Sequence, residues 1–132
     1  MKNFLLVIGS CFIGLSALFH AYIFYLESLA WTKPKTWKAF GIASQEAAET
    51  IRPMALNQGF YNLFLALEIG AGFVALAFNE KIGFALIIAG AASILGAGLV
   101  LFFSVKTSRR AAIIQATPPL IGLVLLLLGA LS

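Results

Sequence analysis

Charged residues are scarce in this chain. They make up 11% of its 132 residues, whereas hydrophobic residues make up 61%. Soluble domains carry roughly 25% charged residues. The composition therefore excludes an ordinary soluble domain and indicates an integral membrane protein.

Cysteine and histidine are nearly absent, and so are the motifs of common enzymes. Cys11 is the only cysteine, which excludes an internal disulfide and a metal site made of cysteines alone. His20 is the only histidine, so a zinc site would lack ligands even if Glu27 took part. No nucleophile motif, phosphate loop or redox pair is present. We expect no metal and no cofactor, and hydrolase, kinase and oxidoreductase functions have no support.

Long apolar runs occupy most of the chain instead. About 20 apolar residues span the hydrocarbon core of a bilayer. Four stretches reach this length, at residues 4–29, 54–78, 82–105 and 111–131. The first is expected to remain as a membrane helix and not to be removed as a signal. The sequence thus predicts an all-α fold, a four-transmembrane-helix bundle forming a single transmembrane domain over residues 1–132.

Basic residues are distributed unevenly between the predicted loops, which indicates the orientation. Loop 30–53 contains four and loop 106–110 contains three, whereas Lys2 and Lys81 are the only ones on the other side. We therefore expect both basic loops in the cytoplasm and both termini outside, in a bacterial inner membrane. Such loops meet anionic lipid headgroups. Membrane lipids are expected partners, and nucleic acid is not.

The first loop is long enough to have structure of its own. Ser44 is a favourable helix N-cap, and Glu46 lies near the positive helix end. These residues predict a short interfacial helix that leads into the second span through Pro53. Trp31, Trp37 and Phe40 fit an aromatic belt at the membrane surface. The loop could serve as a connector or as a lid over a cytoplasm-facing pocket.

Polar side chains inside the apolar stretches predict the functional site. His20 and Glu27 are seven residues apart, so they lie within about 20° of one another on a helix. His20 lies roughly 13 Å from the cytoplasmic boundary. Side chains of the second and fourth helices fall in the same layer, and they should face inward because lipid offers no hydrogen bonds. We take His20 and Glu27 as candidate catalytic residues and the following as candidate ligand-binding residues: Trp31, Asn57, Gln58, Tyr61, Asn62 and Gln115.

Three functions are compatible with this site. The first is a pocket for a small or amphiphilic molecule, in which His20 and Glu27 could carry out acid–base chemistry such as isomerisation. The second is proton-coupled transport by an oligomer, and the third is an accessory or structural subunit of a larger complex. The sequence leaves open whether the protein is an enzyme.

The third apolar stretch is rich in glycine and alanine at four-residue spacing, as in Ala92 and Gly96. Small residues allow helices to approach closely. The stripe predicts packing within the bundle, with a homo-oligomer through this helix as the alternative.

Two strings carry a family resemblance. His20 to Glu27 is followed by Trp31 and by Phe40–Gly41, and the segment from Asn57 to Ala66 reads NQGFYNLFLA. The chain is similar in these strings, and in its glutamine early in the last helix, to the bacterial membrane protein family known as domain of unknown function 1304. The resemblance implies a small four-helix membrane protein and no particular activity. Glu68 departs from the family pattern, which puts a general role for that residue in doubt.

Overall fold

The computed structural model describes residues 1–132 and contains helices and no strands, which confirms the all-α prediction. Its helices are α1 (Lys2–Phe24), α2 (Pro34–Ala39), α3 (Gln45–Ala75), α4 (Glu80–Ser104) and α5 (Arg109–Leu131). A π-helical turn, Tyr25–Leu29, follows α1, and a 3₁₀ turn, Lys106–Ser108, precedes α5.

The contacts divide the chain into two compact units. The first unit contains residues 1–18 and 65–132, and the second unit contains residues 19–64. The first unit therefore holds the start of α1, the end of α3, and α4 and α5. The second unit holds the end of α1, the π-turn, α2 and the start of α3. The predicted single domain over residues 1–132 stays a prediction.

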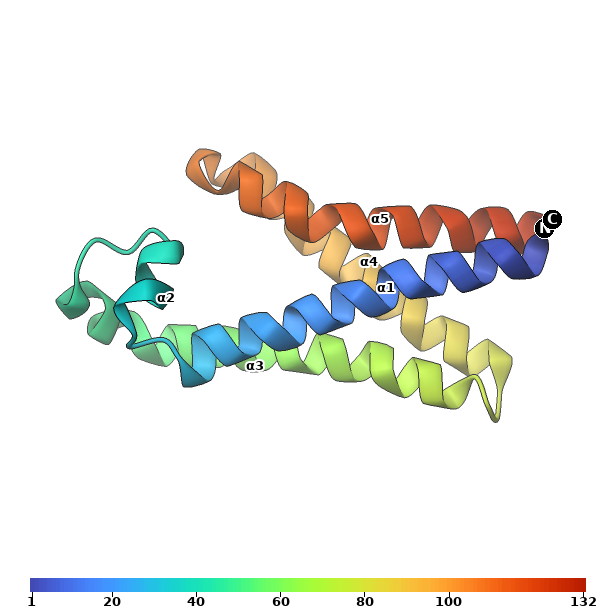
Figure 1. Cartoon of the computed structure of the whole chain (residues 1–132), viewed down its shortest axis with the longest axis horizontal. Helices are drawn as coiled ribbons and strands as arrows, with labels where there is room; N and C mark the ends of the chain where they lie inside the picture. The colour runs from blue at the N-terminus through green and yellow to red at the C-terminus, as the bar shows by residue number, and fades with distance from the viewer. The chain divides into compact units, whose positions relative to one another are not determined.

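Close helix contacts at glycine hold the first unit together. A Cβ on Gly9 would lie 2.9 Å from the Gly122 carbonyl oxygen, so α1 and α5 approach nearly backbone to backbone. Figure 1 shows these helices side by side where the two chain ends meet. Gly98 of α4 packs equally closely on Ala116 of α5. The core between the helices consists of Ile13, Ile69, Ile87, Ala91, Ile94 and Leu126.

Glycine and alanine of α4 thus serve packing within the chain. Gly83, Gly90, Ala91 and Gly98 are buried. Gly96 lies on the exposed side of the helix, where a Cβ would have no heavy atom within 4 Å. An oligomer through the exposed small residues stays a prediction.

Three helical segments are long and apolar enough to cross a membrane: Lys2–Leu29, Glu80–Ser104 and Lys106–Leu131. They suggest that the protein is associated with a membrane. Helix α3, in which the sequence predicts a span over 54–78, is not among them. Its apolar residues are interrupted by Asn57, Gln58, Asn62 and Glu68, and these polar side chains lower the mean hydropathy of the helix.

The first loop differs from its prediction. Ser44 does cap a helix, since its hydroxyl accepts the Ala47 N–H at 3.1 Å. That helix is no separate short element, however, because α3 continues through Pro53 to Ala75. A proline removes only one helical hydrogen bond, to the carbonyl four residues back. Here that carbonyl belongs to Glu49, which is exposed and can be solvated. The short helix of this loop is α2 instead.

Substitution of Gly72 should separate α3 from α4. A Cβ there would lie 2.9 Å from the Ile87 nitrogen and 3.0 Å from the Gly83 carbonyl oxygen, and neither backbone atom can yield easily. We expect Gly72→Ala to lower the free energy of unfolding by about 1–3 kcal/mol, measured by unfolding in detergent. Gly70→Ala is the matched control, because nothing lies within 4 Å of its Cβ position. Equal stability of the two variants would contradict the close contact.

Candidate functional site

The first of the segments that are long and apolar enough to cross a membrane ends in a π-turn. The Ala30 N–H donates to the Tyr25 carbonyl oxygen, five residues back, at 2.9 Å. Single π-turns are rare and frequently occur at functional sites. The turn Tyr25–Leu29 contains Glu27, whose side chain is buried and 8% exposed. The sequence gives no signal for this turn.

Glu27 is bonded to Asn62 across the second unit. The Asn62 side-chain amide donates to a carboxylate oxygen of Glu27 at 2.9 Å, and the same nitrogen donates to the Gln58 carbonyl oxygen at 3.1 Å. Asn62 is also buried, at 8% exposure. Two residues that the sequence assigned to one site are therefore in direct contact, one from the π-turn that follows α1 and one from α3.

Gly59 allows the two helices to come this close. A Cβ at this position would lie 3.1 Å from the Glu27 Cβ and 3.2 Å from the Ser28 nitrogen, and it would overlap the Ser28 hydroxyl. That hydroxyl donates to the Leu56 carbonyl oxygen at 3.2 Å. Next to this contact, the rings of Phe24 and Phe60 meet edge to face at 5.2 Å. Ser28 and Gly59 are site residues that sequence reasoning missed.

His20 lies in the second unit as well and is almost fully buried, at 1% exposure. Its ring contacts the Phe19 ring edge to face, with the centroids 5.8 Å apart. The burial agrees with the prediction that His20 and Glu27 face away from lipid. A catalytic role for either residue stays a prediction.

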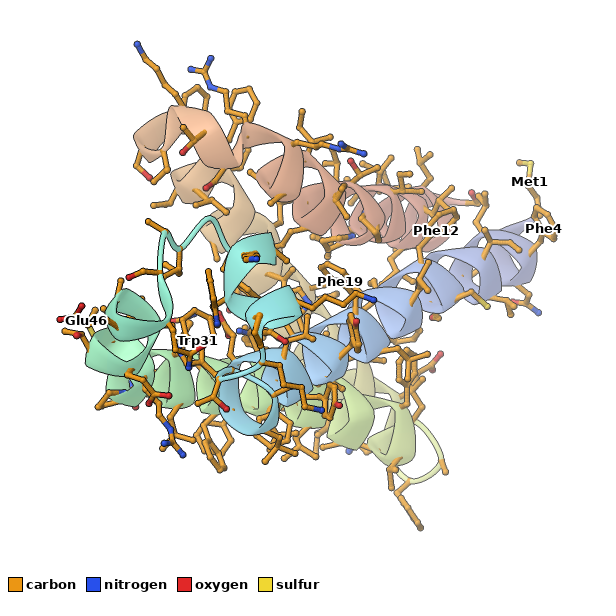
Figure 2. The ribbon with its side chains drawn as sticks, turned by 60° about the vertical axis from the view of Figure 1, so that its left-hand side comes forward. Met1, Phe4, Phe12, Phe19, Trp31 and Glu46 are labelled. Carbon is orange, nitrogen blue, oxygen red and sulfur yellow. The ribbon has the colours of Figure 1, made fainter.

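The tryptophans of the first loop form a small core instead of an exposed aromatic belt. Trp31 and Trp37 are 5% and 6% exposed. The Trp31 indole N–H donates to the Ala48 carbonyl oxygen at 2.8 Å, and that of Trp37 donates to the Gln45 side chain at 2.8 Å. Figure 2 shows Trp31 against the first turns of α3, near the end that carries Glu46. The expected belt is wrong for the two tryptophans, because their rings are buried and their N–H groups find acceptors within the protein. Phe40 is exposed, and its place in a belt stays a prediction.

The remaining predicted residues have different surroundings. Asn57, Gln58 and Tyr61 are exposed on α3. Asn57, Tyr61 and Glu68 share a stripe of this helix, which is expected to face inward together with Gln58 and Asn62 on its flank. That expectation is wrong for Asn57, Gln58 and Tyr61, because the inward face carries Ala55, Gly59 and Asn62, which are buried. Small residues permit the helix contact on that face, whereas Tyr61 would block it. Gln115 is half-buried on α5, in the first unit. Ligand binding by these residues stays a prediction.

Glu27 has hydrogen-bond acceptor sites that Asn62 does not occupy. A carboxyl group has two oxygens and, when ionised, about four acceptor sites, and the Asn62 amide occupies one. Glu27 can therefore accept further hydrogen bonds from a donor or a cation. No group of three or more metal-binding side chains occurs in the structure.

Two grooves in the structure lie elsewhere. One, of about 500 Å³, is lined by α1, α3 and α4, and the other, of about 430 Å³, by α1, α4 and α5. Both belong to the first unit and contain none of the predicted site residues.

These features define a small helical protein with three segments long and apolar enough to cross a membrane and a buried carboxyl–amide pair at the end of the first. A family model described as "Protein of unknown function (DUF1304)" matches residues 14–127, and the chain belongs to this family. The matched range includes both members of the pair and confirms the resemblance found in the sequence. Comparisons with curated proteins and with solved structures gave no match.

Loss of the Asn62 amide should destabilise the fold, because the Glu27 carboxyl group loses its hydrogen-bond donor. We expect Asn62→Leu to lower the free energy of unfolding by about 1–3 kcal/mol, because a buried carboxyl group loses its donor. The same substitution should cost much less in a Glu27→Leu background, where no carboxyl group remains. Unfolding of the four proteins in detergent measures this coupling.

Asn57→Leu serves as the control, because Asn57 is exposed on the same helix. It should leave stability nearly unchanged. If Asn62→Leu costs the same with and without Glu27, the hydrogen bond does not stabilise the fold.

Proposed function

We propose that this chain is a four-span protein of the bacterial inner membrane that binds a small amphiphilic molecule at Glu27 and Asn62. In this proposal α3 supplies the fourth span, both termini lie outside, and loops 30–53 and 106–110 are cytoplasmic. Helix α2 and the first turns of α3 then lie at the cytoplasmic membrane surface. Exposed Lys33, Lys35 and Lys38 around α2 are suited to anionic headgroups there.

The packing of α3 supports its role as a span. Its second half contacts α4 at Gly72 and Ile87, and α4 is itself apolar enough to cross a membrane. Asn62, a polar side chain within the proposed span, has a partner inside the protein, since its amide donates to Glu27. A polar side chain that is bonded within the protein is tolerated at membrane depth.

The single observation that carries the binding proposal is the buried Glu27 carboxyl group with spare acceptor capacity. A carboxyl group in a membrane segment is costly and marks a functional site by default. Because the group accepts hydrogen bonds, its ligand should have a donor head, such as an amine or a hydroxyl. The rings of Phe24 and Phe60 beside it offer an apolar surface for the ligand's body.

Other residues have supporting roles in the proposal. Exposed Gln58 and Tyr61, within one turn of Asn62 on α3, could bind the rim of the head group. His20 is the candidate for proton exchange. The competing structural role is favoured by one observation, that Glu27 already has a protein donor in Asn62. A binding experiment separates the two.

Decylamine is a suitable probe, with decanol and decanoate as chain-matched controls. In protein reconstituted in nanodiscs, we expect decylamine at ten times its dissociation constant to stabilise the wild type by about 1.4 kcal/mol, a few degrees in Tm. Decanol should stabilise the protein less than decylamine does. Decanoate should not stabilise it at all, because the Glu27 carboxylate repels a second carboxylate. Glu27→Gln should abolish the effect of decylamine.

Glu68→Gln is the matched control, since Glu68 is the other glutamate among the apolar residues of the predicted spans. It should keep the full response. If wild type and Glu27→Gln respond equally to decylamine, the binding proposal fails. If Glu27→Gln only lowers Tm and no probe shifts either protein, the structural role is supported.

A further inference from the structure

A second site lies in the first unit, where α1 begins and α5 ends. The groove of about 430 Å³ has apolar walls from three helices. Leu6 of α1, Phe84 and Ile88 of α4, and Leu123 and Leu127 of α5 line it. Its volume lies within the range of roughly 300–1,000 Å³ that is typical of ligand sites. The pair of Glu27 and Asn62 belongs to the second unit, so this groove is independent of the proposed function.

Two opposite charges stand at the mouth of the groove. Lys2 and Glu80 belong to its lining, and both are exposed. Lys2 and Glu80 do not form an ion pair with each other. The Glu80 side chain is also not needed to cap α4. Asn79 performs that role by accepting the Lys81 and Ile82 N–H groups.

An apolar channel with a cation and an anion at one end matches a particular class of molecule. Lys2 and Glu80 lie in the first turns of α1 and α4, where the membrane-crossing segments begin. At that level a bilayer places its headgroups. We infer that the groove holds an acyl chain of a zwitterionic phospholipid, whose phosphate binds Lys2 and whose ammonium binds Glu80. Phosphatidylglycerol, an anionic lipid, lacks the ammonium group and would leave the Glu80 carboxylate without a cationic partner.

Native mass spectrometry of the whole protein tests the inference. Wild-type protein is released from bilayers of equal parts phosphatidylethanolamine and phosphatidylglycerol, and the retained lipids are counted. We expect retention of one phosphatidylethanolamine molecule. Leu127→Trp should lose it, because the indole fills the groove. Val124→Trp should retain it, since Val124 is exposed on the same helix but does not line the groove.

The charges are tested separately. Glu80→Gln should shift retention toward phosphatidylglycerol, and Lys2→Gln should weaken retention of both lipids. Lys81→Gln is the control for charge at this end of the molecule. It should change neither the amount of lipid retained nor the preference between the two lipids. The inference is overturned if wild type retains phosphatidylglycerol as readily as phosphatidylethanolamine, or if Leu127→Trp retains as much lipid as Val124→Trp. Leu127→Trp should keep the decylamine response, which distinguishes this site from the one at Glu27.

Discussion

The contact between the buried Glu27 carboxyl group and the Asn62 amide is the constraint on which the packing of the second unit depends, because a buried carboxyl group without a partner is costly. The Asn62 amide donates to the Glu27 carboxyl group at 2.9 Å, which requires the π-turn after α1 and the middle of α3 to lie almost in contact. Gly59 makes that approach possible, because any side chain there would overlap Ser28. The same device recurs in the first unit, where glycine brings α5 against α1 and α4. Since lipid is as apolar as leucine, close packing and buried hydrogen bonds replace the hydrophobic effect between such helices.

The sequence predicts the helices well where a long apolar run alone determines their position. Apolar runs of sufficient length locate α1, α4 and α5, and Ser44 marks the start of α3. The sequence also singles out Glu27 and Asn62, because they are polar residues within apolar stretches.

Other features depend on how the helices pack against one another, which a local sequence pattern does not predict. The π-turn shifts the register at Glu27 after α1 has ended. The inward face of α3 is set by Gly59, so Tyr61 turns outward although it shares a polar stripe with Asn57. The loop tryptophans are buried because acceptors at Ala48 and Gln45 lie within reach.

The two proposed sites differ in chemistry. The site in the second unit is a buried carboxyl group with one amide donor, suited to a single donor head group. The groove in the first unit has apolar walls and two separated charges at its mouth, suited to a larger zwitterion. In this view the Glu27 site gives the protein its function, whereas the groove binds a lipid of the surrounding bilayer. Because the family model spans residues 14–127, Glu27, Asn62 and Gly59 lie in the region that defines the family, whereas Lys2 lies outside it.

The central claim is that the Glu27 carboxyl group receives a ligand in addition to Asn62. The most direct measurement is an experimental structure of the protein purified in a mild detergent, combined with mass spectrometry of small molecules extracted from the same sample. The account predicts non-protein density within hydrogen-bonding distance of Glu27, and a co-purifying molecule with an amine or hydroxyl head. A carboxyl group bonded only to protein side chains, in a sample without such a molecule, would contradict the account and leave a structural role for the pair.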